Sequence, residues 1–288
     1  MTPLRSLHAS LIFLLVSCTH AGSALSPRRV LVSGAGGQTG SRVLKLLESK
    51  PETFSAVGLV RTEESKASLP ETSEVVVGSI TDPAALKECM SGCDALIICT
   101  SATPKPSSET TPEGRPIFGF PNGQPEEVDW IGQKNQIDAA QKAGVSHVVI
   151  CGSMGGTNPG NMLNSIGKGD DGKGGNILLW KRKAEDYLMK SGLIYTIVHP
   201  GGLVNEPGGL RELVVGVDDS QEGTDNRNIP RDDVARVLVA SLEQASFAKR
   251  SFDVRSKPEG EGSPTADFSS LLDRIGDANC DYSLGEIP

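Results

Sequence analysis

A glycine-rich turn near the start of the chain places the strictest constraint on its fold. An apolar run over residues 29–33 leads directly into Gly34-Ala35-Gly36-Gly37-Gln38-Thr39-Gly40, and residues 41–47 continue as an amphipathic helix. Glycines permit a tight turn and a close approach of the backbone to pyrophosphate, whose charge is attracted by the helix N-terminus. The order of strand, turn and helix therefore predicts a dinucleotide site that includes Gly34, Gly36, Gly37, Gln38, Thr39 and Gly40.

The rest of the sequence alternates short β-branched runs with helix-like segments. This pattern is typical of an α/β protein with a doubly wound parallel sheet, a Rossmann fold, covered by helices on both faces. The chain has 288 residues, 37% of them hydrophobic, which is enough for one such domain over residues 28–288. Strands are expected near 29–33, 54–60, 74–78, 94–99, 146–151, 193–198 and 251–254, and helices near 38–49, 82–91, 127–143, 175–190, 231–245 and 265–275.

Three long segments, 101–126, 152–174 and 200–230, are rich in glycine, proline, serine or asparagine, and each follows an expected strand. Ligands of open α/β sheets bind outside the carboxyl ends of the strands. We therefore expect these segments to form the walls of a substrate site. The alternative is that they are surface insertions or disordered.

Residues after the next expected strands bear on which dinucleotide binds. About twenty residues beyond the turn, where an NAD-binding protein carries Asp or Glu against the ribose hydroxyls, the sequence has Arg61. A guanidinium pairs with phosphate, so Arg61 favours NADP over NAD, unless it only solvates the end of the strand. Ser79 and Ile80 are expected to contact the adenine, with Ile80 as ordinary core the alternative. Thr100 and Ser101 are expected beside the cofactor.

The net charge and the first residues bear on partners and location. A formal net charge of −8 argues against nucleic acid as a partner. Residues 1–25 have the sequence pattern of a removable signal peptide. Their apolar run is too short to span a membrane. The remaining cysteines are odd in number without metal-site spacing, and no Asn-x-Ser/Thr acceptor occurs. We expect no stable membrane insertion after the leader is removed. We also expect a two-part leader to deliver the protein to a plastid, with secretion as the alternative.

Three later segments carry a family resemblance: VDWIGQKNQIDAA (residues 128–140), CGSMGGTNP (151–159) and WKRKAE (180–185). The chain resembles a group of plant and algal NAD(P)-binding proteins among the atypical short-chain dehydrogenases, and the likeness covers residues 28–275. Distant relatives include NmrA-like redox sensors, a flavin and biliverdin reductase, and a plastid-import-associated protein. The resemblance implies bound NADP, a monomer or weak dimer, and no settled substrate.

The candidate catalytic residues depart from the usual short-chain dehydrogenase pattern. That mechanism uses a Tyr four residues before a Lys, but here Leu179 stands four residues before Lys183. The remaining catalytic candidates are Ser153, which would orient a carbonyl or the carboxamide, and Lys183, which would hold the ribose hydroxyls. His199 is a candidate proton donor. A turn role for Ser153 and a structural role for His199 are the alternatives, and no metal ligand is expected.

Two functions fit these residues. The first is an NADPH-dependent oxidoreductase of a small conjugated or quinone-like acceptor, in which positioning of the hydride does most of the work and solvent supplies the proton. The alternative is a non-catalytic protein that senses NADPH, or that binds NADPH to stabilise a surface on which a partner docks. Because Lys183 suits both functions, it does not discriminate between them.

Overall fold

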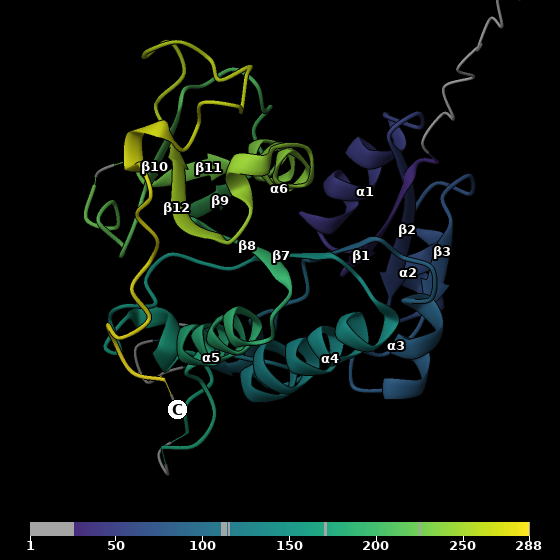
Figure 1. Ribbon diagram of the computed structural model, residues 1–288. Helices are drawn as coiled ribbons and strands as arrows, with labels where there is room; N and C mark the ends of the chain where they lie inside the picture. The colour runs from purple at the N-terminus through teal and green to yellow at the C-terminus, as the bar shows by residue number, and fades with distance from the viewer. Residues whose placement is uncertain (1–25, 111–113, 115, 170–171, 225, 288) are drawn as a thin grey trace, which may run out of the picture.

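An eight-stranded sheet forms the centre of the protein in the computed structural model, which describes residues 26–110, 114, 116–169, 172–224 and 226–287 (Figure 1). The strand order is β10-β12-β8-β7-β4-β1-β2-β3, and only the β10–β12 pair is antiparallel. The predicted doubly wound sheet is confirmed. Its strands are β1 (Arg28–Ser33), β2 (Phe54–Val60), β3 (Val75–Val77), β4 (Ala95–Ile98), β7 (His147–Cys151), β8 (Ile194–Pro200), β10 (Leu213–Gly216) and β12 (Arg250–Ser256).

Helices cover both faces of the sheet. One face packs against α1 (Gly40–Glu48) and α6 (Arg231–Glu243), and the other against α3 (Pro83–Cys89), α4 (Gln133–Ala143) and α5 (Ile177–Lys190) (Figure 1). The short α2 (Glu63–Ala67) follows β2. Successive side chains of a strand point to opposite faces, so Val30 and Val32 join the core beside α1 and α6, while Leu31 joins the core on the other side.

Local sequence signals explain where several helices begin and end. The Asp82 side chain accepts a hydrogen bond of 2.9 Å from the Ala84 N–H, and Pro83 occupies the first helical position of α3. At the other end of its helix, Gly144 closes α4 with a φ of 77°. These signals were readable from the sequence, and they place the helices so that the carboxyl ends of the central strands stay open.

The long segments contain regular structure that the sequence pattern does not predict. Segment 101–126 holds an antiparallel hairpin of β5 (Lys105–Thr110) and β6 (Pro116–Gly119), and segment 152–174 holds the 3₁₀ turn η2 (Met162–Ser165). Segment 200–230 supplies β10 and a small parallel pair, β9 (Gly202–Val204) with β11 (Asn228–Pro230). The polar residues of β5 and the shortness of β6, β9 and β11 hide these strands from a search for apolar runs.

Two predicted helices differ from the structure. The predicted helix over 127–143 begins as a π-helix, η1 (Glu126–Gly132), before it continues as α4. The helix predicted over 265–275 is wrong, because only the 3₁₀ turn η4 (Asp273–Ile275) forms there. The Asp267 side chain accepts hydrogen bonds of 2.8 Å from both the N–H and the hydroxyl of Ser269, and such local bonds compete with helix formation.

The predictions for the first residues stay untested by the fold. The leader predicted at residues 1–25 lies outside the described residues. Within the part of the chain that the structure describes, no helix combines the length and the apolar character needed to cross a membrane.

Candidate functional site

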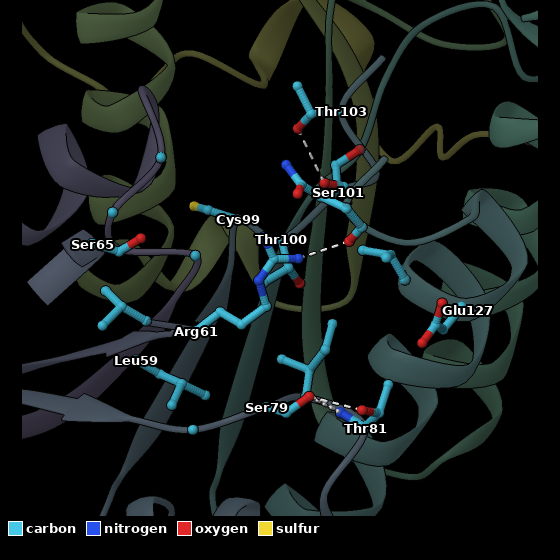
Figure 2. A pocket seen from close by; sticks show the side chains of 18 residues that line it. Leu59, Arg61, Ser65, Ser79, Thr81, Cys99, Thr100, Ser101, Thr103 and Glu127 are labelled. Carbon is cyan, nitrogen blue, oxygen red and sulfur yellow. Dashed lines mark hydrogen bonds between the residues drawn. The ribbon is translucent and has the colours of Figure 1, made fainter. Parts of the chain in front are cut away.

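A cavity of about 390 Å³ lies where the carboxyl ends of β1, β2 and β4 meet the residues after β3 (Figure 2). One wall is the glycine turn, and another is formed by residues of segment 101–126 and η1. The lining includes Gly34, Gly36, Gly37, Leu59, Val60, Arg61, Ser65, Gly78, Ser79, Ile80, Thr81, Cys99, Thr100, Ser101, Thr103, Asn122, Glu127 and Val128. A space of this size at this edge of the sheet suits part of a dinucleotide.

The glycine turn is shaped by close backbone contacts. Gly34 has a φ of 71°, and a Cβ there would come within 2.9 Å of the Cys99 backbone. A Cβ on Gly40 would overlap the carbonyl oxygen of Gly34. Gly36, Gly37 and Gln38 are exposed, and Thr39 immediately precedes α1. The turn therefore tolerates no larger residue at Gly34 or Gly40, and it presents its backbone to the cavity.

Arg61 lines the cavity, as the sequence suggested. Its Nη1 donates a hydrogen bond of 2.7 Å to the backbone carbonyl of Asn122. Asn122 belongs to segment 101–126, so this one side chain joins the end of β2 to the far wall. A guanidinium has five donors, which leaves capacity for a phosphate at the same place.

Four more of the predicted cofactor residues border this cavity, namely Ser79, Ile80, Thr100 and Ser101, whereas Gln38, Thr39 and Gly40 are not among its lining residues. Ser79 Oγ lies 2.7 Å from Thr81 Oγ1. Ile80 packs so tightly on Gly132 that a Cβ on that glycine would overlap its side chain. The Thr100 hydroxyl accepts a bond of 3.2 Å from Gln136 Nε2, and Ser101 Oγ donates to the Ala102 carbonyl at 3.1 Å. The structure thus brings residues from four separate strand ends around one space.

A buried ion pair stands beside the strand ends. Lys181 Nζ lies 2.7 Å from Asp129 Oδ1, and Asp129 Oδ2 accepts the Ala102 N–H at 3.0 Å. The two side chains are 8% and 0% exposed. Burial alone would lower the pKa of Lys181, but the Asp129 carboxylate reverses that effect and holds it above its usual value. Lys181 therefore stays protonated, its charge is balanced by the Asp129 carboxylate, and Asp129 fixes the loop after β4.

The structure places the predicted ribose-binding residue Lys183 against two tryptophan rings. Its ammonium lies over the rings of Trp130 and Trp180, 5.0 and 5.1 Å from their centroids. It does not line the cavity. Lys181, two residues earlier, is the lysine of α5 that turns toward the sheet edge, and the residue four positions before it is Ile177. The tyrosine of the usual mechanism is therefore missing for either lysine.

Two cysteine thiols lie at the edge of the sheet next to Lys181. Cys99 follows β4 and Cys151 ends β7, and these strands are paired. Burial raises the pKa of Cys99 well above its usual value and that of Cys151 to about 11, although the charge of Lys181 opposes both changes. Both sulfurs are therefore protonated at neutral pH and do not act as thiolate nucleophiles.

Ser153 lies just beyond the end of β7, outside the residues that line the cavity. Its Oγ donates a hydrogen bond of 3.1 Å to the Met154 carbonyl. Asp219 fastens the next residues, because its carboxylate accepts the N–H groups of Gly155 and Thr157, each at 2.7 Å. Ser153 thus sits on a loop held in one position along the same sheet edge.

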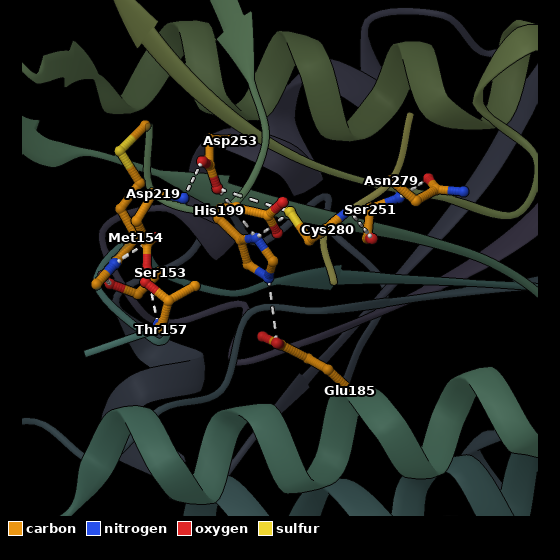
Figure 3. Close-up of polar contacts among 12 residues, drawn as sticks. Ser153, Met154, Thr157, Glu185, His199, Asp219, Ser251, Asp253, Asn279 and Cys280 are labelled. Atoms are coloured by element: carbon orange, nitrogen blue, oxygen red, sulfur yellow. Dashed lines mark hydrogen bonds and ion pairs between the residues drawn. The ribbon is translucent and has the colours of Figure 1, made fainter. Parts of the chain in front are cut away.

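His199, the predicted proton donor, lies buried and apart from the residues that line the cavity, as its structural alternative requires. The residue is 4% exposed, and its Nε2 lies 3.1 Å from Glu185 Oε2 (Figure 3). On the other side its Nδ1 faces Asp253 and Cys280. Burial lowers the pKa of His199, but Glu185, Cys280 and Asp253 outweigh it, and the net pKa is well above the ordinary value. A ring enclosed in this way has no path to a substrate.

Sequence reasoning missed Lys181, Asp129 and Glu185. The helical spacing of α5 contained a signal, since Lys181 and Glu185 share a face with buried Leu188. Asp129 lies among acidic residues near a helix start, a pattern typical of exposed charges, whereas its side chain is fully buried. An acidic residue on the buried face of one helix and a basic one on another would have indicated an ion pair.

The protein-family model for NAD(P)H-binding proteins matches residues 34–245. An uncharacterized chloroplastic protein of Arabidopsis thaliana is 50% identical over 258 residues, which are 88% of this chain and 78% of that protein. Sanguinarine reductase of Eschscholzia californica is 48% identical over 266 residues, 85% of this chain and 95% of the enzyme. Among solved structures, the oxidoreductase ylbE of Lactococcus lactis matches the fold with a TM-score of 0.60, 20% identity and coverage of 86% and 96%.

Proposed function

The chain belongs to the NAD(P)H-binding family, and on that premise we propose that it is an NADPH-dependent oxidoreductase that reduces a small conjugated or quinone-like acceptor. The observation that carries the proposal is the cavity of the glycine turn, with Arg61 at its rim. The reductase name of the 48% identical relative supports the reaction class. When bound, NADPH would supply the hydride.

The residues present fit NADP better than NAD. The backbone N–H of the exposed Gly36 would hold the pyrophosphate at the start of α1, whereas the Gly37 N–H already donates to the Gly34 carbonyl at 2.9 Å. Arg61 offers a cation where the extra 2′-phosphate would lie, and Ser79 and Ile80 border the space for the adenine. No residue among these is an acid that would select the 2′-hydroxyl of NAD.

The side chains at the other end favour hydride positioning over proton transfer. Of the three tyrosines in the chain, the hydroxyl of Tyr187 donates to Asp138 at 2.6 Å and that of Tyr282 to Glu185 at 3.1 Å. The third, Tyr195, lies on β8 near its amino end, away from the open edge. Ser153 remains as the hydroxyl that would orient an acceptor, on the sheet edge beside the buried Lys181–Asp129 pair. Such an acceptor must take its proton from water, as conjugated rings and quinones do.

Location and assembly belong to the same proposal. The Arabidopsis relative is a chloroplastic protein by name, which supports delivery to a plastid. We propose that residues 1–25 act as the targeting leader and that the domain works as a monomer or weak dimer on a small-molecule substrate.

Turnover tests the proposal directly. Purified protein with NADPH is expected to lose the absorbance of reduced nicotinamide when a flavin, a quinone or a linear tetrapyrrole is supplied. Ser153→Ala should slow this about tenfold, as expected for one hydrogen bond of about 1.4 kcal/mol. The matched control Lys183→Met should keep the wild-type rate, because that lysine contacts tryptophan rings. Tight NADPH binding without turnover on any acceptor would instead favour an NADPH sensor or scaffold.

A further inference from the structure

Three side chains of different chemistry converge away from the dinucleotide cavity (Figure 3). His199 comes from β8, Asp253 from the neighbouring β12, and Cys280 from a segment that follows η4. They are 4%, 0% and 5% exposed, respectively. An imidazole, a carboxylate and a thiol in one buried place are three of the four protein groups that most often bind transition metals.

The distances between the three potential ligand atoms match those around one metal ion. His199 Nδ1 lies 3.3 Å from Asp253 Oδ1 and 3.5 Å from Cys280 Sγ, and the sulfur lies 3.9 Å from the same carboxylate oxygen. A tetrahedral zinc ion with bonds of about 2.0–2.3 Å separates its ligand atoms by about 3.3–3.8 Å, which is the bond length multiplied by about 1.6. All three ligand atoms therefore already stand near the corners of such a site.

Hydrogen bonds to neighbouring residues orient each of these three groups toward a common point. Glu185 Oε2 lies 3.1 Å from His199 Nε2, so Nδ1 is the nitrogen that faces the other two residues. A carboxylate on the second nitrogen is the usual outer partner of a metal-bound histidine. Asp253 Oδ2 accepts the Asp219 N–H at 2.8 Å, which leaves Oδ1 for a metal. The Cys280 N–H donates to Ser251, which holds the thiol in place.

We propose that His199, Asp253 and Cys280 bind a zinc ion, with water in the fourth position. A mixed nitrogen, oxygen and sulfur set suits zinc, whereas magnesium and calcium prefer oxygen ligands and copper(I) prefers sulfur. Binding would release two protons to solvent, the thiol proton of Cys280 and the Nδ1 proton of the His199 imidazolium, and the zinc charge would compensate the buried carboxylates of Asp253 and Glu185. The three ligands lie far apart in the sequence, so no spacing motif announces them.

The zinc ion would fasten residues 276–287 to the sheet. That segment already contacts the domain through Arg182, whose Nη2 donates to the carbonyls of Asp281 and Leu284 at 2.8 and 3.0 Å. Its Gly285 lies against the backbone of Gly156 and Thr157 in the loop that follows Ser153. A metal bond at Cys280 would therefore brace the loop that carries Ser153, without touching the substrate.

Cobalt(II) is the sharpest probe because its bond to a thiolate produces an intense charge-transfer absorption. Metal-depleted full-length protein is expected to bind one cobalt per chain with that band, and zinc should displace it. Cys280→Ala should abolish the band, while the matched variant of another buried thiol, Cys89→Ala, should keep it. NADPH binding, measured on every variant, shows that the fold survives.

A second measurement needs no substitution. Wild-type protein treated with a strong chelator is expected to lose residues 276–287 to carboxypeptidase at least several-fold faster than zinc-loaded protein. If wild-type protein takes up neither cobalt nor zinc at micromolar concentration, and the chelator leaves digestion unchanged, the cluster is a hydrogen-bonded imidazolium and the proposal is wrong. A cobalt–thiolate band that persists in Cys280→Ala would overturn it equally.

Discussion

Replacing Lys181 by methionine is expected to destabilise the protein by about 3–5 kcal/mol, which is the cost of leaving one partner of a buried ion pair charged and alone. Asp129 is fully buried and lies 2.7 Å from the Lys181 ammonium. Its other oxygen holds the Ala102 N–H, so the loop after β4 should also loosen. Urea unfolding followed by circular dichroism gives the change in the free energy of unfolding.

The pairing is tested by a second substitution in the same protein. Asp129→Asn removes the stranded charge and keeps an oxygen for the Ala102 N–H, so the double variant with Lys181→Met should recover most of the lost stability. Lys183→Met is the matched control on the same helix and should cost only about 0.5–1 kcal/mol, the usual size of a cation–π contact. Equal losses for Lys181→Met and Lys183→Met would contradict the assignment of Lys181 as the buried partner.

Arg61→Ala is expected to weaken NADPH binding about 10- to 100-fold and to leave NADH binding nearly unchanged. A charged hydrogen-bonded contact contributes about 1.5–3 kcal/mol, and only NADPH carries the 2′-phosphate that would receive it. The Arg61 contact with the Asn122 carbonyl is lost with both cofactors, so its effect cancels in the ratio. Isothermal titration calorimetry with each nucleotide gives the two affinities.

A control variant separates the phosphate contact from general damage to the cavity. Ser79→Ala changes a lining residue on the adenine side, so it should alter NADPH and NADH binding by similar factors. If Arg61→Ala weakens both nucleotides equally, Arg61 shapes the cavity and does not select the phosphate.

The dinucleotide cavity was predictable because its determinants are local. The strand, the turn from Gly34 to Gly40 and the helix are contiguous, and Arg61 follows from the position of the next strand end. Backbone sterics alone require glycine at the closest contacts, as the space around Gly34 and Gly40 confirms. The parallel sheet with helices on both faces likewise follows from the alternation of apolar runs and helices.

The buried charges were less predictable for physical reasons. A π-helical turn in η1 shifts the angular position of Asp129 relative to the α-helical residues that follow, so a regular helical period does not place it. Lys181 and Lys183 differ by two positions, which is about 200° around an α-helix, and only packing against the sheet shows which one is buried. His199 and Cys280 are 81 residues apart, and their contact depends on the path of the chain after β12.

A crystal structure of the protein with NADPH tests the central claim most directly. We expect the 2′-phosphate within hydrogen-bond distance of the Arg61 guanidinium and the pyrophosphate over the Gly36 N–H at the start of α1. The nicotinamide should point toward the Lys181 and Ser153 end of the sheet edge. A nucleotide bound with its adenosine outside the cavity, or a cavity that stays empty at saturating NADPH, would contradict it.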